Sequence, residues 1–204
     1  MHLIPTEEEV VAVLRETGAL RDGHFEYPTG VHSNEYLQVP LAMRYYQYQR
    51  MLSVGLSRLL RANPEIRAIV PHLSIVTPAT GGLPVAYGVC EAMRAKQVYW
   101  AERQHDAEPL RFRQYLEPKA GEQVVIVDDI LRTGAQLTEL KALLESRGAI
   151  VVGLAMIIYQ PTPQTLSFGT LPLYYLAKLE ASYYAAGAEC ALCKRGLPLE
   201  KVWI

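Results

Sequence analysis

Short runs of apolar residues alternate with amphipathic stretches over the greater part of the chain. The runs lie at residues 74–76, 97–100, 123–127 and 149–158. Between them, residues 83–94 and 136–147 repeat apolar positions with the helical period. Strands that are apolar on both faces and alternate with helices are typical of a parallel sheet covered on both sides. The pattern therefore predicts the α/β class.

The N-terminal part of the chain follows another pattern. Thr6 precedes three glutamates, which predicts an N-cap followed by acids in the first helical turn, where the helix dipole favours them. The apolar positions that follow predict an amphipathic helix ending near residues 17–18. Residues 23–40 are rich in Gly, Tyr, Thr, Ser and Asn, and we expect loops and short strands there.

A second helix is predicted over residues 46–62, stopped by the Asn-Pro pair that follows it. The apolar triplets 68–70 and 74–76 then lie so close together that the sequence allows one strand at the second triplet or one strand across both. Either strand leads into a Gly-containing loop over residues 77–82.

The stretch from residue 124 to residue 140 carries the strongest chemical signal. A buried strand ends in Asp128-Asp129, passes through a turn with Thr133-Gly134 and enters a helix. Ligands of open α/β sheets bind at the carboxyl ends of strands, and a helix N-terminus there offers N–H groups to a phosphate. Carboxylates suit sugar hydroxyls or Mg²⁺ instead. Two acids alone are equally compatible with solvated strand ends, but the combination favours a ligand site.

This stretch resembles the phosphoribosyl pyrophosphate signature of type I phosphoribosyltransferases. Other segments narrow the resemblance to the orotate phosphoribosyltransferase family, because they follow its hood, pyrophosphate loop, catalytic loop and C-terminal pattern in order. These segments are residues 18–36, 77–84, 101–113, 168–173 and 190–199. The resemblance implies a type I phosphoribosyltransferase fold, with a central, mostly parallel sheet flanked by helices and a small N-terminal hood. It implies a single domain over residues 1–204, with the hood at about 1–45, the core at about 46–180 and a C-terminal appendage with a CxxC pair at about 181–204.

The resemblance also implies roles for particular residues. The expected catalytic residues are Asp128, Asp129 and Arg103, and the two aspartates would also serve Mg²⁺, mostly through substrate and water. The expected ribose 5-phosphate loop is Arg132, Thr133, Gly134, Ala135 and Gln136. The expected pyrophosphate loop is Ala79, Thr80, Gly81 and Gly82. The base pocket is expected to involve Phe25, Pro28, Tyr36, Arg132 and Gln160.

The chain departs from the family pattern at the base pocket and in the catalytic loop. Residues 101–116 contain no lysine, although family members usually carry lysine in that loop. Pro28 stands where the hood usually has a cation, and Gln160 stands where an arginine normally faces the base. Replacing a charge-assisted hydrogen bond by a neutral one removes about 1.5–3 kcal/mol. Arg132 replaces a threonine, and could restore the charge, strengthen phosphate binding or fill the base pocket.

The implied activity is transfer of ribose 5-phosphate from 5-phosphoribosyl pyrophosphate to a base nitrogen, with release of pyrophosphate. Orotate, giving orotidine 5'-phosphate in pyrimidine biosynthesis, is the expected acceptor. Two alternatives stay open: a different acceptor base, or a non-catalytic regulator that binds phosphoribosyl pyrophosphate or a nucleotide. The family also implies a homodimer whose catalytic loop crosses into the partner's site. Tyr45, Tyr46 and Tyr48 suit such an interface, and a solvated helix face equally.

Composition adds limits on partners and compartment. The formal net charge of −1 gives no case for nucleic acid as a partner. No apolar run approaches the roughly 18–20 residues needed to cross a bilayer, and the N-terminus lacks the features of a secretory signal. Three cysteines are too few for a disulfide framework, so a reducing cytoplasm is expected.

The spacing of Cys190 and Cys193 is that of half a zinc site or of a redox pair. Zinc needs four ligands, and the chain has no second CxxC pair while its five histidines lie far away in sequence. A redox role would need a helix start in a thioredoxin-like unit. We therefore expect neither, and interpret the tail as a packed appendage, with Cys90 in the core.

Overall fold

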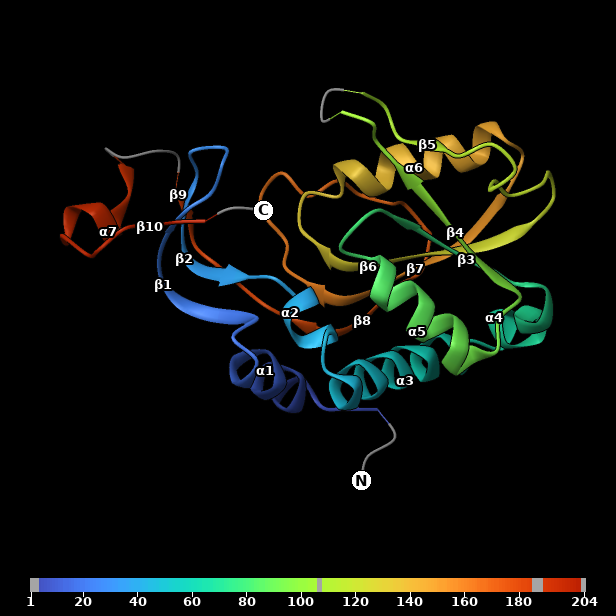
Figure 1. The fold of residues 1–204 in the computed structure, drawn as a ribbon, viewed down its shortest axis with the longest axis horizontal. Helices are drawn as coiled ribbons and strands as arrows, with labels where there is room; N and C mark the ends of the chain where they lie inside the picture. The colour runs from blue at the N-terminus through green and yellow to red at the C-terminus, as the bar shows by residue number, and fades with distance from the viewer. Residues whose placement is uncertain (1–3, 106–107, 185–188, 203–204) are drawn as a thin grey trace.

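A six-stranded sheet forms the centre of the molecule (Figure 1). The computed structural model describes residues 4–105, 108–184 and 189–202. The strands of this sheet are β3 (Ser74–Pro78), β4 (Gln97–Glu102), β5 (Arg111–Phe112), β6 (Gln123–Leu131), β7 (Ile150–Tyr159) and β8 (Leu173–Lys178), in the order β5-β4-β3-β6-β7-β8. Every pairing is parallel except that of β4 with β5. The predicted α/β class with a mostly parallel sheet is confirmed.

Helices cover both faces of this sheet (Figure 1). The helices of the described chain are α1 (Glu7–Glu16), α2 (Pro40–Met43), α3 (Tyr46–Ala62), α4 (Pro64–Ile69), α5 (Leu83–Met93), α6 (Ala135–Ser146) and α7 (Ala191–Lys194), with a 3-10 turn η1 (Val70–His72); α6 lies on one face of the sheet, α3 and α5 lie on the other, and α7 lies outside the hood. Along β6, Val125 packs into the cluster that contains α3 and α5, while Ile126 packs into the cluster under α6. Because successive side chains of a strand point to opposite faces, a strand buried on both sides must be apolar throughout.

A second, four-stranded sheet forms the hood at one end of the molecule (Figure 1). Its strands are β1 (Leu20–Glu26), β2 (His32–Leu37), β9 (Tyr183–Tyr184) and β10 (Glu200–Lys201), in the order β10-β1-β2-β9. The register of β1 against β2 shifts between Asp22 and Phe25, which is the signature of a β-bulge. Half of the hood strands therefore come from the C-terminal part of the chain.

The predicted helix starts agree with the structure. Thr6 and Glu9 form a reciprocal capping box, in which Glu9 N–H donates to Thr6 Oγ1 at 3.2 Å and Thr6 N–H donates to Glu9 Oε2 at 2.9 Å. The interpretation of one strand across 68–70 and 74–76 is wrong, since only the second triplet is a strand. Asn63 caps a further short helix by accepting from Glu65 N–H at 2.8 Å, with Pro64 at its first position.

Strand β6 is longer than the apolar run predicts. It continues through both aspartates, and Asp128 pairs with Met156 and Leu131 with Tyr159 on β7. The acids therefore stand on a hydrogen-bonded strand end and not in the loop after it. Such a support fixes their backbone, and so the direction of both carboxylates.

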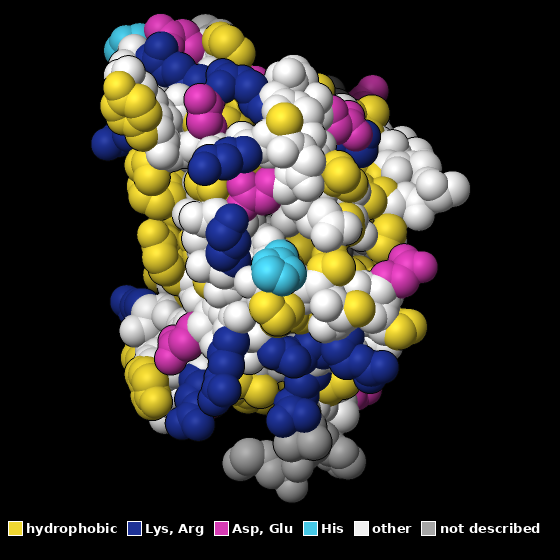
Figure 2. Space-filling model, turned by 90° about the vertical axis from the view of Figure 1, so that its right-hand side faces the viewer, with side chains coloured by type: hydrophobic (Ala, Val, Ile, Leu, Met, Phe, Trp, Pro, Cys, Tyr) yellow, Lys and Arg dark blue, Asp and Glu magenta, His cyan; other side chains and the backbone are white. Residues whose placement is uncertain are grey.

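The face at the amino ends of the strands lies opposite the hood. Figure 2 shows Lys and Arg side chains gathered near its lower edge, with both charges and single hydrophobic side chains mixed above. Among the described residues, no helix combines the length and apolar character needed to cross a membrane. The hollow described next lies at the other end of the strands, towards the hood.

Candidate active site

A cavity of about 670 Å³ opens between the hood and the carboxyl ends of β3 and β6. Its lining comes from three places: hood residues Tyr27, Tyr36, Leu37 and Gln38 with Pro40, the loop residues 78–81, and residues 128–137. This is the position where open α/β sheets bind ligands. The structure thus brings together the acids, the Thr-Gly turn and most of the loop 79–82 singled out in the sequence.

Buried Asp128 and half-buried Asp129 lie side by side in the lining of this cavity. Asp129 N–H donates to Asp128 Oδ1 at 2.9 Å, and Ile130 N–H donates to Asp129 Oδ1 at 2.9 Å. Burial raises the pKa of Asp128 well above its usual range, and the neighbouring charge of Asp129 raises it further. Burial also raises the pKa of Asp129. Their ionised forms therefore need a positive or hydrogen-bonding ligand, and carboxylate oxygens are the donors that suit Mg²⁺.

The loop over residues 79–82 closes tightly on the two acids. A Cβ at Gly81 would lie 3.0 Å from Asp129 Oδ2, and a Cβ at Gly82 would lie 2.6 Å from Asp128 Oδ1. Ala79 N–H donates to the Ala101 carbonyl at 2.8 Å, which ties the loop to β4. Ala79 and Gly81 line the cavity, whereas Gly82 is the N-cap of α5. Only glycine allows the loop to come this close to the carboxylates.

The N-terminus of α6 forms the wall next to the acids. Gly134 is its N-cap with a left-handed φ of 77°, and a Cβ there would lie 3.1 Å from the ring of Phe168. Thr133 accepts from Leu166 N–H at 2.8 Å through its carbonyl, which fixes the turn. Residues 133–136 all line the cavity, so the helix start and its dipole face an anion bound there.

Arg132 brings a guanidinium to the cavity on a fixed support. Its Nε donates to Gln160 Oε1 at 2.9 Å, its Nη2 donates to the Leu37 carbonyl at 3.2 Å, and it lies over the Tyr27 ring at 5.5 Å. Gln160 is only 1% exposed and also accepts from the Tyr183 hydroxyl at 2.8 Å. Burial raises the pKa of Tyr183 to about 12, so this hydroxyl remains a donor. Gln160 therefore fixes the Arg132 guanidinium by accepting its hydrogen bond, and does not itself line the cavity.

Phe25 and Pro28, like Gln160, were expected in the base pocket but do not line the cavity. Phe25 is buried in a small cluster with Tyr27 and Val202, and Pro28 is exposed in the turn after β1. Tyr27, which lies between them, lines the cavity together with the expected Tyr36. The expectation for Phe25 and Pro28 is corrected for a physical reason: the bulge in β1 changes which side chains face the core. No local pattern in the sequence indicates that bulge.

Arg103 lies beside the main cavity and not in its lining. It borders an adjoining hollow together with Thr80 and Gln136. Its guanidinium is paired with Glu139 of α6 and also donates to the Glu108 carbonyl. Burial raises the pKa of Glu139, but hydrogen bonds from Arg103 and from Leu110 N–H outweigh it, and the pKa is lowered. Arg103 is thus held at the edge of the site by a charged partner.

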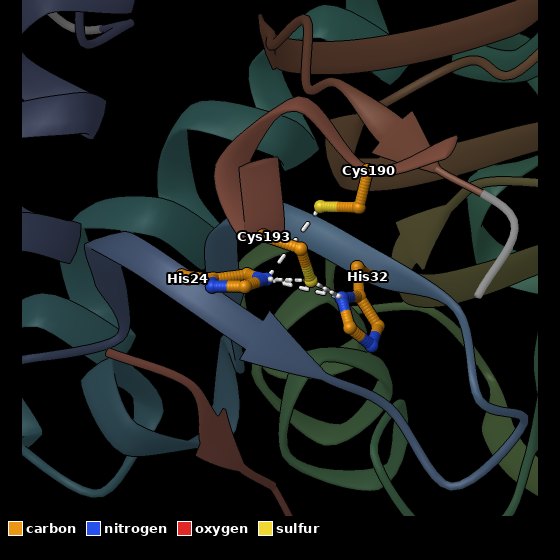
Figure 3. A group of neighbouring side chains, drawn as sticks. All are labelled: His24, His32, Cys190 and Cys193. Carbon is orange, nitrogen blue, oxygen red and sulfur yellow. Dashed lines mark hydrogen bonds between the residues drawn. The ribbon is translucent and has the colours of Figure 1, made fainter. Parts of the chain in front are cut away.

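The expectation that Cys190 and Cys193 lack further metal ligands is wrong. They meet His24 and His32 of the hood, and the four potential ligand atoms all lie within 4.8 Å of one another (Figure 3). A helix does start directly after Cys190, but it belongs to the appendage against the hood. The histidines were excluded as metal ligands because they lie far from the cysteines in sequence, but the fold brings the four side chains together. Cys90 is half-buried and packs against the main core.

Comparison with known proteins agrees with the fold. A family model described as "Phosphoribosyl transferase domain" matches residues 67–167. The chain is 33% identical over 189 residues to the orotate phosphoribosyltransferase of Thermotoga maritima, covering 93% of this chain and 94% of that protein. It is 31% identical over 196 residues to the orotate phosphoribosyltransferase of Pelotomaculum thermopropionicum, covering 96% of each chain.

Solved structures agree at the level of the fold. The crystal structure of orotate phosphoribosyltransferase from Aeropyrum pernix matches with a TM-score of 0.66 at 20% identity, over 83% of this chain and 93% of that chain. Fold and site together define a phosphoribosyltransferase of type I. With relatives above 30% identity over nearly its whole length, the chain belongs to the orotate phosphoribosyltransferase family.

Proposed function

We propose that this protein transfers the ribose 5-phosphate group of 5-phosphoribosyl pyrophosphate to a ring nitrogen of orotate, forming orotidine 5'-phosphate and releasing pyrophosphate. The observation that carries the proposal is the pair of buried Asp128 and half-buried Asp129, placed between the N-terminus of α6 and the loop 79–81 in one cavity. The start of α6 would hold one anion, the two carboxylates would hold hydroxyl groups, and the loop 79–81 would hold a second anion. That is the order of groups in a phosphorylated ribose with a pyrophosphate at C1.

The substrate is assigned to the cavity by its chemistry. The 5-phosphate would accept hydrogen bonds from residues 133–136 at the start of α6, where the dipole and Gly134 favour an anion. The ribose hydroxyls would donate to Asp128 and Asp129, whose buried carboxylates lack other cations within hydrogen-bond distance among the described residues. The pyrophosphate would lie against Thr80 and Gly81, with Arg103 at its far side.

During transfer, the bond from C1 to the pyrophosphate oxygen breaks and the bond from C1 to the base nitrogen forms, while the proton of that nitrogen passes to the released pyrophosphate or to solvent. Negative charge grows on the pyrophosphate while the ribose becomes positively charged. The carboxylates of Asp128 and Asp129 would stabilise the positive ribose, and Arg103 and the N–H groups of the loop would stabilise the leaving group. Mg²⁺, which fits the oxygen donors at this site, would supply further charge neutralisation for the leaving pyrophosphate when bound.

The acceptor is assigned from the position of Arg132. Its guanidinium lies among Tyr27, Tyr36 and the Leu37 carbonyl at the hood side of the cavity, so a flat anionic base would find an aromatic wall and a cation together. A guanidinium can bind a carboxylate through two parallel hydrogen bonds. Arg132 would thereby supply the cationic contact to the base that the neutral residues Pro28 and Gln160 cannot make.

The proposal is tested by a turnover assay with 5-phosphoribosyl pyrophosphate and Mg²⁺, following the loss of orotate beside a panel of other bases. Orotate-dependent release of pyrophosphate is the expected result. Turnover with another base and none with orotate would refute the acceptor, and point to a pocket altered by Arg132. Binding of 5-phosphoribosyl pyrophosphate without turnover of any base would refute catalysis, and would agree with the lysine-free loop over residues 101–116.

We further propose that the enzyme acts in the cytoplasm as a homodimer. Tyr46 is 75% exposed and Tyr45 is 41% exposed at the start of α3, a composition that suits a protein interface. Light scattering on the purified protein distinguishes a dimer from a monomer. A Tyr46→Lys variant is expected to shift the equilibrium towards monomer if this helix face is part of the interface.

A further inference from the structure

Helix α7 lies on the outer side of the hood (Figure 1), and four side chains with the composition of a metal site meet between α7 and the hood strands (Figure 3). His24 stands on β1 and His32 on the neighbouring strand β2. Cys190 caps α7 and Cys193 lies within it. In Figure 3 the two sulfur atoms and one nitrogen of each ring point towards one another. The proposed reaction uses none of these four residues.

The spacing of the ligand atoms fits a tetrahedral ion. Bond lengths of about 2.0–2.1 Å to nitrogen and about 2.3 Å to sulfur place two nitrogen ligands about 3.3 Å apart, and a nitrogen and a sulfur about 3.6 Å apart. His24 Nε2 and His32 Nδ1 are 3.0 Å apart. His24 Nε2 lies 3.5 Å from Cys190 Sγ and 3.6 Å from Cys193 Sγ, and His32 Nδ1 lies 3.3 Å from Cys193 Sγ. These four separations lie within about 0.3 Å of the tetrahedral values, and all six are within 4.8 Å.

Hydrogen bonding alone does not account for this arrangement. His24 Nδ1 lies 3.0 Å from the Leu197 carbonyl oxygen, an acceptor, so Nδ1 carries the proton of this ring. The Nε2 atom of the neutral ring then has one lone pair, yet three groups converge on it. A metal ion takes that lone pair and the other three ligand atoms at once. The Leu197 carbonyl then has the role that second-shell acceptors play in fixing a histidine ligand.

Burial and charge agree with a metal ion of charge +2. His24 is 4% exposed, His32 is 5% exposed and Cys190 is fully buried. Two neutral imidazoles and two thiolates carry a charge of −2, so the complete site would be neutral. A neutral buried site avoids the large cost of an unpaired buried charge. The Cys₂His₂ set is typical of zinc, and four protein ligands leave no open position for a substrate.

We infer that His24, His32, Cys190 and Cys193 bind one structural Zn²⁺, which fastens the C-terminal appendage to the hood. The strand pairing at this point is short: β10 pairs with β1 through Phe25 with Glu200 and Glu26 with Lys201, beside an ion pair of Arg21 with Glu200 and the packing of Val202 against Phe25. Tyr27 and Tyr36 of the same hood line the cavity. The ion therefore stabilises the strands that form one wall of the active site without taking part in the chemistry.

The first test measures the metal in the full chain as purified without added chelator. Elemental analysis is expected to give about one zinc per chain. Replacement by Co²⁺ is expected to give the intense visible bands of a tetrahedral site and a thiolate-to-cobalt charge-transfer band. Thiol titration of the native protein is expected to show Cys190 and Cys193 protected until a chelator is added. Each readout uses the wild-type protein, so none depends on whether a variant folds.

Variants then assign the ligands. Cys193→Ser and His32→Asn are expected to lower zinc affinity by more than the roughly 10–100-fold that loss of a second-shell partner causes. Both should lower the melting temperature of the zinc-loaded protein to that of the chelated wild type. Cys90→Ser and His72→Asn change the same residue types outside the cluster, and are expected to leave zinc content and the cobalt spectrum unchanged.

Three results would overturn the assignment. The first is protein without bound zinc that also fails to bind Co²⁺ tightly when its thiols are reduced. The second is a disulfide between Cys190 and Cys193 in freshly purified protein, which would identify a redox pair. The third is unchanged zinc content in Cys193→Ser and His32→Asn, which would place the ion elsewhere. Because every readout is metal content or stability, failure of the proposed transferase activity has no effect on this test.

Discussion

Replacing Arg132 by glutamine tests whether this residue recognises the carboxylate of the acceptor base. The guanidinium has five N–H donors, and two of its hydrogen bonds are already made, to Gln160 Oε1 and to the Leu37 carbonyl. The remaining donors can bind a carboxylate of orotate. The Arg132→Gln side chain keeps a polar group but loses the charge and the paired donor geometry.

The size of the effect depends on the strength of the hydrogen bond between the guanidinium and the carboxylate. A charge-assisted hydrogen bond contributes about 1.5–3 kcal/mol, and each 1.4 kcal/mol is a factor of ten. We expect kcat/KM for orotate to fall about 10- to 150-fold, with KM for 5-phosphoribosyl pyrophosphate changed only a few-fold. Gln160 keeps its bond from Tyr183, so the loss of stability should be about 1 kcal/mol, or about 2–4 °C in melting temperature.

The decisive assay compares orotate with uracil, which is the same ring without the carboxylate. If Arg132 binds the carboxylate, the preference of the wild type for orotate should nearly disappear in Arg132→Gln. Arg147→Gln removes an arginine from the far end of α6, where it pairs with Glu117, and is expected to change neither rate. An unchanged preference for orotate, together with a raised KM for 5-phosphoribosyl pyrophosphate, would refute the reasoning and assign Arg132 to the phosphate.

Three further predictions concern the rest of the site. Asp128→Asn should abolish turnover and raise the melting temperature at pH 7, because burial raises the pKa of this carboxyl and its ionised form destabilises the fold. The destabilisation is complete above the raised folded-state pKa, declines as the pH falls below it and is gone below the ordinary pKa of an aspartate, so the two melting temperatures should converge on acidification; a gap independent of pH would contradict this. Arg103→Gln should lower kcat/KM for 5-phosphoribosyl pyrophosphate about 10- to 100-fold in steady-state kinetics, whereas a purely structural pair with Glu139 predicts reduced stability and normal kinetics. Gly82→Ala places a Cβ about 2.6 Å from Asp128 Oδ1 and against Thr77 Oγ1, so chemical denaturation should show a loss of about 1–3 kcal/mol and calorimetry weaker binding of 5-phosphoribosyl pyrophosphate; wild-type behaviour in both would show that the loop can relax.

The central sheet and the phosphate turn were predictable from the sequence because their signals are local. In β6, residues 124–127 must be apolar on both faces since they separate two packed clusters, and that requirement is visible in consecutive residues. The acids, Thr133 and Gly134 follow within a few residues, so one continuous segment contains the strand end, the turn and the helix start. The capping box at Thr6 and Glu9 is equally local.

The wall of the base pocket and the metal-ligand cluster were decided by tertiary structure. A bulge between Asp22 and Phe25 sets which hood side chains face the cavity, so that Tyr27 lines it where Pro28 was expected. The return of the chain from β9 to β10 brings Cys190 and Cys193 against histidines more than 150 positions earlier. Hydrophobic periodicity indicates which face of one element is buried, but not which distant segment covers it. Sequence therefore determined the sheet and the proposed anion site, and the packing of the hood determined what surrounds them.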